Sequence, residues 1–218
     1  MAHTVMQLEK SFHVLFVDDS SPDGTGDIIR GLMQEYPGRI FLEQRQGKLG
    51  LGTAYIHGFK YALQQNYEYI FEMDCDFSHN PKDLIRLYDA CAKDGFDFSI
   101  GSRYTKGGKV TNWPLKRLLM SYFASVYVRM ILWISVKDTT AGFKCYRNRV
   151  LSTIQLDNVK FKGYAFQICM KYAAIKNGFK AKEVPITFVD RLYGESKMSS
   201  SIFKEAFLGV WKMRRMKL

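Results

Sequence analysis

The chain has 218 residues, which is enough for one domain with a substantial hydrophobic core. Its 47% hydrophobic and 24% charged residues are typical of a folded globular protein and argue against intrinsic disorder. The net charge of +11 favours an anionic partner, such as a nucleotide, an acidic membrane surface or nucleic acid. We recognise no nucleic-acid-binding motif, so we expect no nucleic-acid partner. The four cysteines are scattered without a Cys-x-x-Cys pair, which argues against zinc and disulfides and predicts reduced thiols in a cytoplasmic protein.

Strands and helices are predicted to alternate along the first hundred residues. Short apolar runs predict four strands, at residues 12–17, 40–43, 69–73 and 96–100. Between them the sequence predicts a helix ending near Glu35, a glycine-rich loop over residues 45–52 with a helix over 53–65, and a helix that Pro81 opens. This alternation predicts a single α/β domain in which a mostly parallel sheet has helices on both faces.

Charged side chains follow several of these strands. Asp18 and Asp19 follow the first strand, Asp74-Cys75-Asp76 follows the third, and Arg103 follows the fourth. Ligands of open α/β sheets bind beyond the carboxyl ends of the strands, so we expect these side chains to meet at one edge. Alternate residues of an extended chain point the same way, so Asp74 and Asp76 can face one cation. Their oxygens suit Mg²⁺ or Mn²⁺ completed by substrate phosphates, and the alternative is a loop with two solvated acids.

Two segments raise the question of a membrane. Residues 118–136 are almost wholly apolar, but an Arg near the middle of a span, here Arg129, costs roughly 2.5–3.5 kcal/mol to insert. We therefore expect a buried helix or one in the membrane interface rather than a span. Residues 203–218 mix apolar side chains with lysines and arginines. This mixture predicts a basic amphipathic helix on an anionic surface, and the alternative is a terminal helix packed on the core with a solvated basic end.

Several longer motifs resemble those of a known family. In chain order they are VDDSSPDGT at residues 17–25, GKLGLGTA at 47–54, DCDFSHNP at 74–81, DTTAGFK at 138–144, GYAFQ at 163–167, EVPI at 183–186 and RLYGESK at 191–197. The first three resemble the inverting glycosyltransferases of family 2, which have the GT-A fold. The later four narrow the resemblance to polyprenyl- (dolichyl-) phosphate mannose synthases. No Gln-x-x-Arg-Trp occurs, which argues against a processive polysaccharide synthase.

The resemblance implies a role for each matching position. The residues expected to bind the donor nucleotide are Val17, Asp19, Asp23, Gly47, Lys48, Gly50, Asp74, Cys75 and Asp76. The expected ligands of a Mg²⁺ or Mn²⁺ cofactor are Asp74, Asp76 and Ser78. The residues expected to carry catalysis are Asp76, Arg103, Arg191 and Lys197. Arginine and lysine suit this role because negative charge grows on the departing diphosphate.

The start of the chain departs from the family pattern. The family's first strand carries a Pro-x-Tyr-Asn-Glu segment that grips the nucleobase, and this chain has no such segment. Residues 1–8 look instead like the end of a helix, so we expect an N-terminal truncation or a wrongly assigned start, which leaves a sheet edge exposed. Exposed edges pair with other chains, which predicts either partial self-association through that edge or disordered loops around the site for the nucleobase.

The sequence therefore predicts a catalytic domain over residues 1–200 and a C-terminal helix over residues 201–218. The expected reaction transfers mannose from GDP-mannose to a polyprenyl phosphate in the membrane, with inversion. The protein is expected to be cytoplasmic and attached peripherally to the inner face of the membrane. Three alternatives remain open, which are the same chemistry with UDP-glucose, a non-catalytic subunit that binds a nucleotide sugar and, ranked last, a basic nucleic-acid binder.

Overall fold

The computed structural model describes residues 1–161, 163–190 and 200–216, with the side chains of the last helix from Phe207 onward. The strands are β1 (Val14–Asp18), β2 (Ile40–Gln44), β3 (Tyr69–Glu72), β4 (Phe98–Ser102), β5 (Lys109–Thr111), β6 (Lys144–Arg147), β7 (Ala181–Pro185) and β8 (Thr187–Val189). The helices are α1 (Ala2–Met6), α2 (Thr25–Glu35), α3 (Leu51–Gln64), α4 (Asp83–Ala92), α5 (Leu115–Leu132), α6 (Asn148–Thr153), α7 (Tyr164–Lys176) and α8 (Ser200–Met213). The four predicted strands and the helices between them are present, with ends no more than two residues from those expected.

The strands form three hydrogen-bonded groups among the described residues. β1 pairs with β2, β5 pairs with β8, and a central sheet has the order β3-β6-β4-β7. The pairs β1–β2, β4–β7 and β5–β8 are parallel, as predicted, whereas β6 runs antiparallel to both β3 and β4. Because β6 runs the other way, its first residue, Lys144, lies opposite Glu72 at the end of β3. The loop that precedes β6 therefore reaches the edge where β3 and β4 end.

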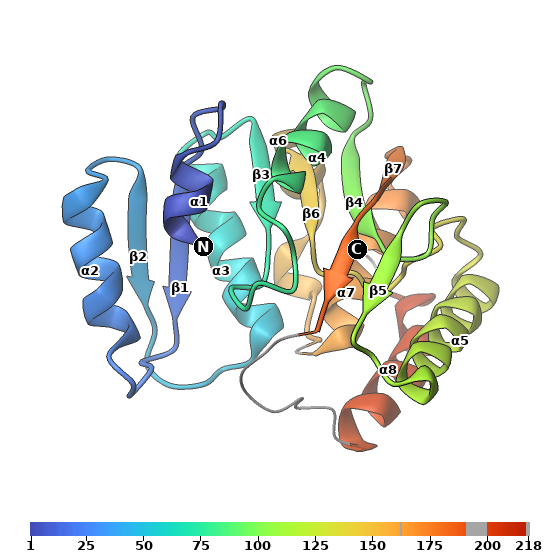
Figure 1. Ribbon diagram of the computed structural model, residues 1–218. Helices are drawn as coiled ribbons and strands as arrows, with labels where there is room; N and C mark the ends of the chain where they lie inside the picture. Colours follow the sequence, from blue (N-terminus) through green and yellow to red (C-terminus); the bar gives the residue numbers. More distant parts are fainter. Residues whose placement is uncertain (162, 191–199, 217–218) are drawn as a thin grey trace.

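β1 and β3 each have one unpaired edge within the described residues. β1 pairs only with β2, and β3 pairs only with β6. In Figure 1 the strands β2, β1, β3, β6, β4 and β7 follow one another across the view. Side chains join the two groups, since the rings of Phe12 and Phe71 pack edge to face with centroids 5.6 Å apart. That a truncated start leaves a sheet edge exposed, and that the protein self-associates through this edge, both stay predictions.

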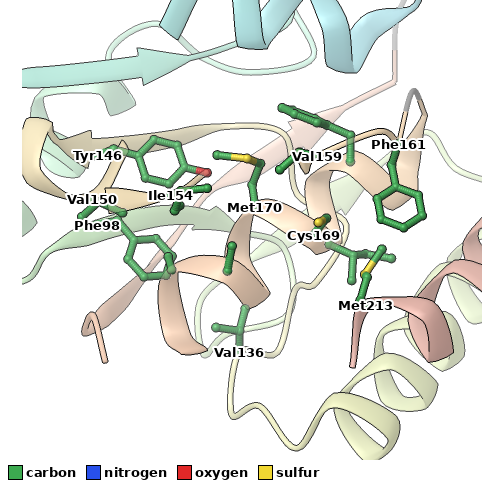
Figure 2. Packing of buried hydrophobic residues seen from close by; sticks show 14 of the residues in the cluster. Phe98, Val136, Tyr146, Val150, Ile154, Val159, Phe161, Cys169, Met170 and Met213 are labelled. Atoms are coloured by element: carbon green, nitrogen blue, oxygen red, sulfur yellow. The ribbon is translucent and has the colours of Figure 1, made fainter. Parts of the chain in front are cut away.

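Helices cover both faces of the sheet, as predicted, and each face has its own hydrophobic core. One core joins β3, β4 and β6 to α3, α5, α6, α7 and α8, and Figure 2 shows Tyr146, Met170 and Met213 within it. The other core joins the opposite face to α1, α2 and α4. Neighbouring side chains of β6 point to opposite faces of the sheet, so Tyr146 lies in the first core and Cys145 in the second.

The helices α5 and α8 lie together at one end of the molecule (Figure 1). The α5 helix buries Ser125, Val128 and Leu132, while α8 buries Val210 and Met213 in the first core. Each helix also has an exposed face with large apolar side chains. The apolar stretch therefore has one buried and one exposed side. In the parts of the chain that the structure describes, no helix is long and apolar enough to cross a bilayer.

Candidate functional site

The glycine-rich loop lies between β2 and α3, next to the end of β1. Gly47 and Gly50 have positive φ angles of 79° and 101°, which glycine adopts without strain. Arg45 donates from Nε to Oδ1 of Asp19 at 2.7 Å and from Nη1 to Oγ1 of Thr53 at 3.0 Å. The hydroxyl of Thr53 in turn donates to the carbonyl of Gly50 at 2.7 Å. These contacts fix the loop against Asp19, so two of the segments expected to bind the nucleotide lie together.

The acidic loop, which is residues 74–81 between β3 and α4, has a defined conformation. The amide of Ser78 donates to Oδ1 of Asp76 at 3.0 Å, and its carbonyl accepts from the amide of Val189 at 3.1 Å. Phe77, between Asp76 and Ser78 in the chain, has a φ of 60°, and this left-handed conformation is strained for a bulky residue. The hydroxyl of Tyr55 donates to Oδ1 of Asp74 at 2.7 Å. Hydrogen bonds from α3, from β8 and within the loop itself therefore hold a strained loop in place, which is typical of a functional site.

Arg103 follows β4 and is paired with Asp138 in the loop before β6. Its Nε and backbone amide donate to Oδ2 of Asp138 at 2.8 and 2.9 Å, and its Nη2 donates to Oδ1 at 2.7 Å. Nη2 also donates to the hydroxyl of Thr140 at 2.8 Å. Burial opposes the charge of Arg103, but the facing carboxylate more than offsets it, so the pKa of Arg103 is raised. The pKa of Asp138 is lowered, because the Arg103 charge outweighs the effect of burial.

Two buried lysines lie beneath the acidic loop. Lys144 is fully buried and contacts both Glu72 and the side chain of Gln167. Lys171 donates to the carbonyls of Thr139 and Ala141 at 3.0 and 2.6 Å. Burial lowers the pKa values of both lysines, most strongly that of Lys171. These contacts fix the loop before β6, which passes beside Asp74, since a Cβ on Gly142 would lie 3.7 Å from Oδ2 of Asp74.

A second group of cations and aromatic rings lies beside Arg103. The guanidinium carbon of Arg103 is 5.4 Å from the ring centre of Trp113 and 5.5 Å from that of Phe188. Arg117, at the start of α5, lies 4.2 Å from the Trp113 ring and donates to Asp190 at 2.8 Å. This group connects the exposed face of α5 to the sheet edge.

The histidine of the acidic loop is buried. His79 is 3% exposed, packs on Phe143 at 5.0 Å between ring centres, and has no hydrogen-bond partner at Nδ1 in the described structure. It lines a cavity of about 540 Å³ together with Phe77 and Arg86. Burial lowers the pKa of His79, so the ring is neutral at pH 7.

The structure brings together only part of the predicted site. Asp74, Asp76, Ser78 and Arg103 gather where β3 and β4 end, while Asp19, Gly47 and Gly50 meet beside β1. Val17 is half-buried against α3, and Cys75 is exposed. Asp23, in the loop before α2, and Lys48, in the glycine-rich loop, are both exposed. Hydrogen bonds from Thr25, and then the Lys48 charge, lower the pKa of Asp23. Arg191 and Lys197 lie outside the described residues.

The acidic loop fits a cation that shares its coordination with a substrate. Oδ1 of Asp76 is occupied by an amide and Oδ1 of Asp74 by a phenol, which leaves one carboxylate oxygen of each without a partner among the described residues. Within the same residues, no group of three or more His, Cys, Asp or Glu side chains could hold a metal ion by itself. Such a donor set suits Mg²⁺ or Mn²⁺, which keep waters and substrate phosphates in their shells. Ser78, a predicted ligand, is 2% exposed.

Sequence reasoning missed several residues that organise this site. Sequence reasoning assigns no role to Tyr55, Arg45 or Glu72, and Asp138 and Lys144 enter it only as the two ends of one motif. Tyr55 and Arg45 have partners 19 and 26 residues away, so local periodicity carried no signal for them. Lysine side chains are usually exposed, so the sequence gives no reason to expect that Lys144 is buried.

Comparison with known proteins agrees with this arrangement. Residues 2–155 match the family described as Glycosyl transferase family 2. The chain is 48% identical over 204 residues to the polyprenol monophosphomannose synthase of Mycolicibacterium smegmatis, covering 93% of this chain and 77% of that protein. It is 45% identical over 197 residues to the undecaprenyl-phosphate mannosyltransferase of Micrococcus luteus, covering 90% and 80%.

Solved structures share the fold at low identity. Glucosyl-3-phosphoglycerate synthase from Mycobacterium tuberculosis, in complex with Mn²⁺, UDP and phosphoglyceric acid, aligns with a TM-score of 0.64 and 13% identity, covering 94% of this chain and 69% of that one. The same protein with Mn²⁺, UDP-glucose and phosphoglyceric acid aligns with a TM-score of 0.60 and 13% identity, covering 94% and 69%. The likeness concerns the α/β architecture, which is the GT-A fold.

Proposed function

Because the chain belongs to glycosyl transferase family 2, we propose that it transfers mannose from GDP-mannose to a polyprenyl phosphate, with inversion at the anomeric carbon. The observation that carries the proposal is the 45–48% identity, over 90–93% of this chain, to two proteins named for mannose transfer to such lipids. The bond between the mannose C1 and the diphosphate oxygen breaks, and a bond from C1 to an oxygen of the acceptor phosphate forms. The products are polyprenyl phosphate mannose and GDP.

The acidic loop is the proposed donor site. Asp74 and Asp76 would hold a Mg²⁺ or Mn²⁺ ion, with Ser78 as a further ligand, and the bound ion would offset the charge that develops on the leaving diphosphate. Asp19, Asp23 and the loop containing Gly47, Lys48 and Gly50 would bind the nucleotide, with Val17 and Cys75 lining it. Asp19 already has a fixed position through Arg45.

Positive charge is the second requirement of the reaction. Arg103 is held beside the sheet edge by Asp138, and its Nη1 has no partner among the described residues, so we propose that the Nη1 N–H groups donate to a phosphate oxygen. Arg191 and Lys197 are proposed to add charge at the same place. A phosphate monoester has a second pKa near 6, so the acceptor is already ionised at neutral pH and needs no catalytic base.

The acceptor is a lipid, and the exposed faces of α5 and α8 are the proposed surface for reaching it. The large exposed apolar side chains on these helices are Leu115, Leu119, Met120, Tyr122, Phe123, Met130, Phe207, Leu208 and Trp211. Basic side chains surround them at Lys116, Lys212, Arg214 and Arg215, all of which are exposed. A surface of this kind suits the headgroup region of an anionic membrane. We place the protein at the cytoplasmic face of the membrane, attached peripherally through this α5–α8 face.

A donor assay tests the proposal. Purified chain is incubated with labelled GDP-mannose or UDP-glucose and a short polyprenyl phosphate, with Mg²⁺, with Mn²⁺ or with EDTA. We expect transfer from GDP-mannose only, dependence on the divalent ion, and a product whose anomeric configuration is opposite to that of the donor. Transfer from UDP-glucose instead would support the glucosyltransferase alternative. Nucleotide binding without any transfer, in preparations with a native melting profile, would support the non-catalytic one.

A further inference from the structure

Tyr55 connects the helix after the glycine-rich loop to the acidic loop. Its hydroxyl donates a hydrogen bond to Oδ1 of Asp74 at 2.7 Å. Burial, and next to it the negative charge of Asp74, raises the pKa of Tyr55 well above its ordinary value. The phenol therefore keeps its proton at neutral pH and can only act as a donor toward the carboxylate.

Aromatic neighbours fix the ring of Tyr55. It stacks on Phe166 of α7 with ring centres 5.9 Å apart and planes inclined by 4°, and on Phe59 at 6.2 Å. The helices α3 and α7 approach closely here, since a Cβ on Gly52 would lie 2.9 Å from Cδ2 of Phe166. A side chain held by such packing keeps its hydroxyl in one place, so the hydrogen bond to Asp74 is formed before any ligand arrives.

The same turn of α3 is anchored to the other acidic position. Thr53, two residues before Tyr55, accepts a hydrogen bond from Arg45, and Arg45 donates to Asp19 at 2.7 Å. One helical turn therefore fixes Asp19 through Thr53 and Arg45, and Asp74 through Tyr55. The relative placement of the two acidic segments depends on this turn.

The hydrogen bond from Tyr55 determines which oxygen Asp74 can offer. Its Oδ1 is occupied, and its Oδ2, which accepts no hydrogen bond from the described residues, lies on the side of Gly142, where an added Cβ would be 3.7 Å away. The amide of Ser78 likewise donates to Oδ1 of Asp76, which leaves Oδ2 of Asp76 without a hydrogen bond from the described residues. Each carboxylate thus presents one oxygen in a fixed orientation.

We infer that Tyr55 is a positioning residue, which acts through Asp74 to orient the acidic loop for the nucleotide donor and its divalent cation. The inference rests on the proposed function, which assigns the donor and cation to Asp74 and Asp76. It adds a residue of α3, outside the acidic loop, whose hydroxyl donates to Asp74 and is assigned no contact with the nucleotide or the cation. Fixing the Asp74 carboxylate in advance removes an ordering cost from the binding step.

Calorimetry with GDP tests the inference without relying on turnover. The affinity for GDP is measured with Mn²⁺ and with EDTA, and the ratio reports how strongly the cation and the nucleotide bind together. In Tyr55→Phe we expect this ratio to fall about tenfold, because a hydrogen bond to a charged group is lost, while the affinity in EDTA stays within about twofold. Tyr146→Phe is the matched control: it also removes a phenol that packs on Phe59, at 5.7 Å, but this hydroxyl has no partner within the described structure. We expect its ratio to equal that of the parent.

A double-mutant cycle keeps the test valid if Tyr55→Phe proves unstable. Asp74→Asn and the double variant are measured in the same way, together with their melting midpoints in EDTA. If Tyr55 acts through Asp74, adding Tyr55→Phe to Asp74→Asn should leave the ratio unchanged within about twofold. If the ratio of GDP affinities with Mn²⁺ and with EDTA is the same in Tyr55→Phe as in the parent, the inference is overturned. A ratio that falls toward one in Asp76→Asn would still support the proposed donor site in that case. If Asp76→Asn also keeps the ratio, the donor site itself is wrong.

Discussion

Arg103 and Asp138 form a bidentate ion pair at the edge of the sheet where β4 ends. Nε donates to Oδ2 at 2.8 Å and Nη2 to Oδ1 at 2.7 Å, and the two side chains are 8% and 0% exposed. The loop that carries Asp138 is also pinned by Lys171, through the carbonyls of Thr139 and Ala141. The guanidinium proposed to face the diphosphate is therefore positioned by the same loop that passes beside Asp74.

Breaking this pair should destabilise the protein. Asp138→Asn keeps the volume of the side chain but leaves a buried guanidinium without its counter-charge, which costs about 3–5 kcal/mol. Urea unfolding should show this loss in the free energy of unfolding. Asp157→Asn is the control, because Asp157 pairs with Lys60 on the surface and is 82% exposed. A change of less than about 1 kcal/mol in Asp138→Asn would mean that the pair is not needed to hold the loop.

The strands and their loops could be predicted because their signal is local. The apolar run at residues 69–73 and the two carboxylates after it mark both a strand and a site, and the structure places Asp74 and Asp76 where expected. The family and the GT-A fold, predicted from motifs that cover nearly the whole chain, are confirmed. The assignment of nucleotide, metal and catalytic roles to single residues stays a prediction.

The rest depends on pairings between distant segments. The antiparallel insertion of β6 between β3 and β4 joins residues 72 to 78 positions apart in the β3–β6 pairs and 44 to 48 positions apart in the β4–β6 pairs. Periodicity in a short window holds no information on such pairing. The sequence predicts that Arg103 binds a phosphate or the sugar, and it gives no sign that two of the guanidinium nitrogens bind Asp138. That partner lies 35 residues away in a motif that local patterns could not place in space.

Asp76 is expected to be essential for turnover. Asp76→Asn keeps the shape of the side chain but removes the charge that would hold the cation, so the rate should fall by about 10²-fold or more. Initial rates at saturating GDP-mannose, measured over a range of Mg²⁺ concentrations, check this. Asp157→Asn again serves as the control. Turnover close to that of the parent would remove the metal-site assignment.

Arg191 and Lys197 are expected from their motif to bind the diphosphate or the sugar. Arg191→Ala and Lys197→Ala should each lower the rate by about 10²–10³-fold, the loss typical of a donor aimed at developing charge. Because the expected effect is on turnover rather than folding, far-ultraviolet circular dichroism and melting midpoints should match those of the parent. If both variants keep rates within about twofold of the parent, the roles given to these residues are wrong.

His79 should make the fold sensitive to mild acid. Its pKa in the folded state is lowered by burial, so below the ordinary value of 6.5 the unfolded chain binds a proton that the folded chain does not. Stability is therefore full above pH 6.5 and falls as the pH drops toward the folded-state pKa, with a limiting slope of about 1.4 kcal/mol per pH unit for one proton. Urea unfolding at several pH values from about 7.5 down to about 5, a range that includes the ordinary pKa of histidine, measures the slope. His79→Gln should lose it, whereas His13→Gln, at an exposed position, should keep it.

The α5–α8 face should bind anionic membranes. The two helices are joined by the stacked rings of Tyr127 and Phe207, 4.7 Å apart, and by the indole of Trp211, which donates to the Tyr127 hydroxyl at 3.0 Å. Their outer side chains include Phe123 at 61% and Leu208 at 56% exposure, near the exposed bases Arg214 and Arg215. Liposome co-sedimentation should therefore show binding that rises with the fraction of anionic lipid and weakens with salt.

Paired variants separate the apolar and the electrostatic contributions to this binding. Phe123→Ser with Leu208→Ser should weaken binding by about tenfold or more at every salt concentration, because less apolar surface enters the interface. Arg214→Gln with Arg215→Gln should instead weaken it mainly at low salt, by about thirtyfold, since each of the two basic residues near an anionic surface contributes about 1 kcal/mol. Ile28→Ser is the matched control, because Ile28 is 67% exposed on α2, outside this face. Equal binding of all variants, or binding that ignores both anionic lipid and salt, would show that the α5–α8 face is not the membrane surface. If this face delivers the protein to its lipid substrate, the two paired variants should lose transfer to an acceptor in liposomes. They should keep normal transfer to a short, water-soluble polyprenyl phosphate.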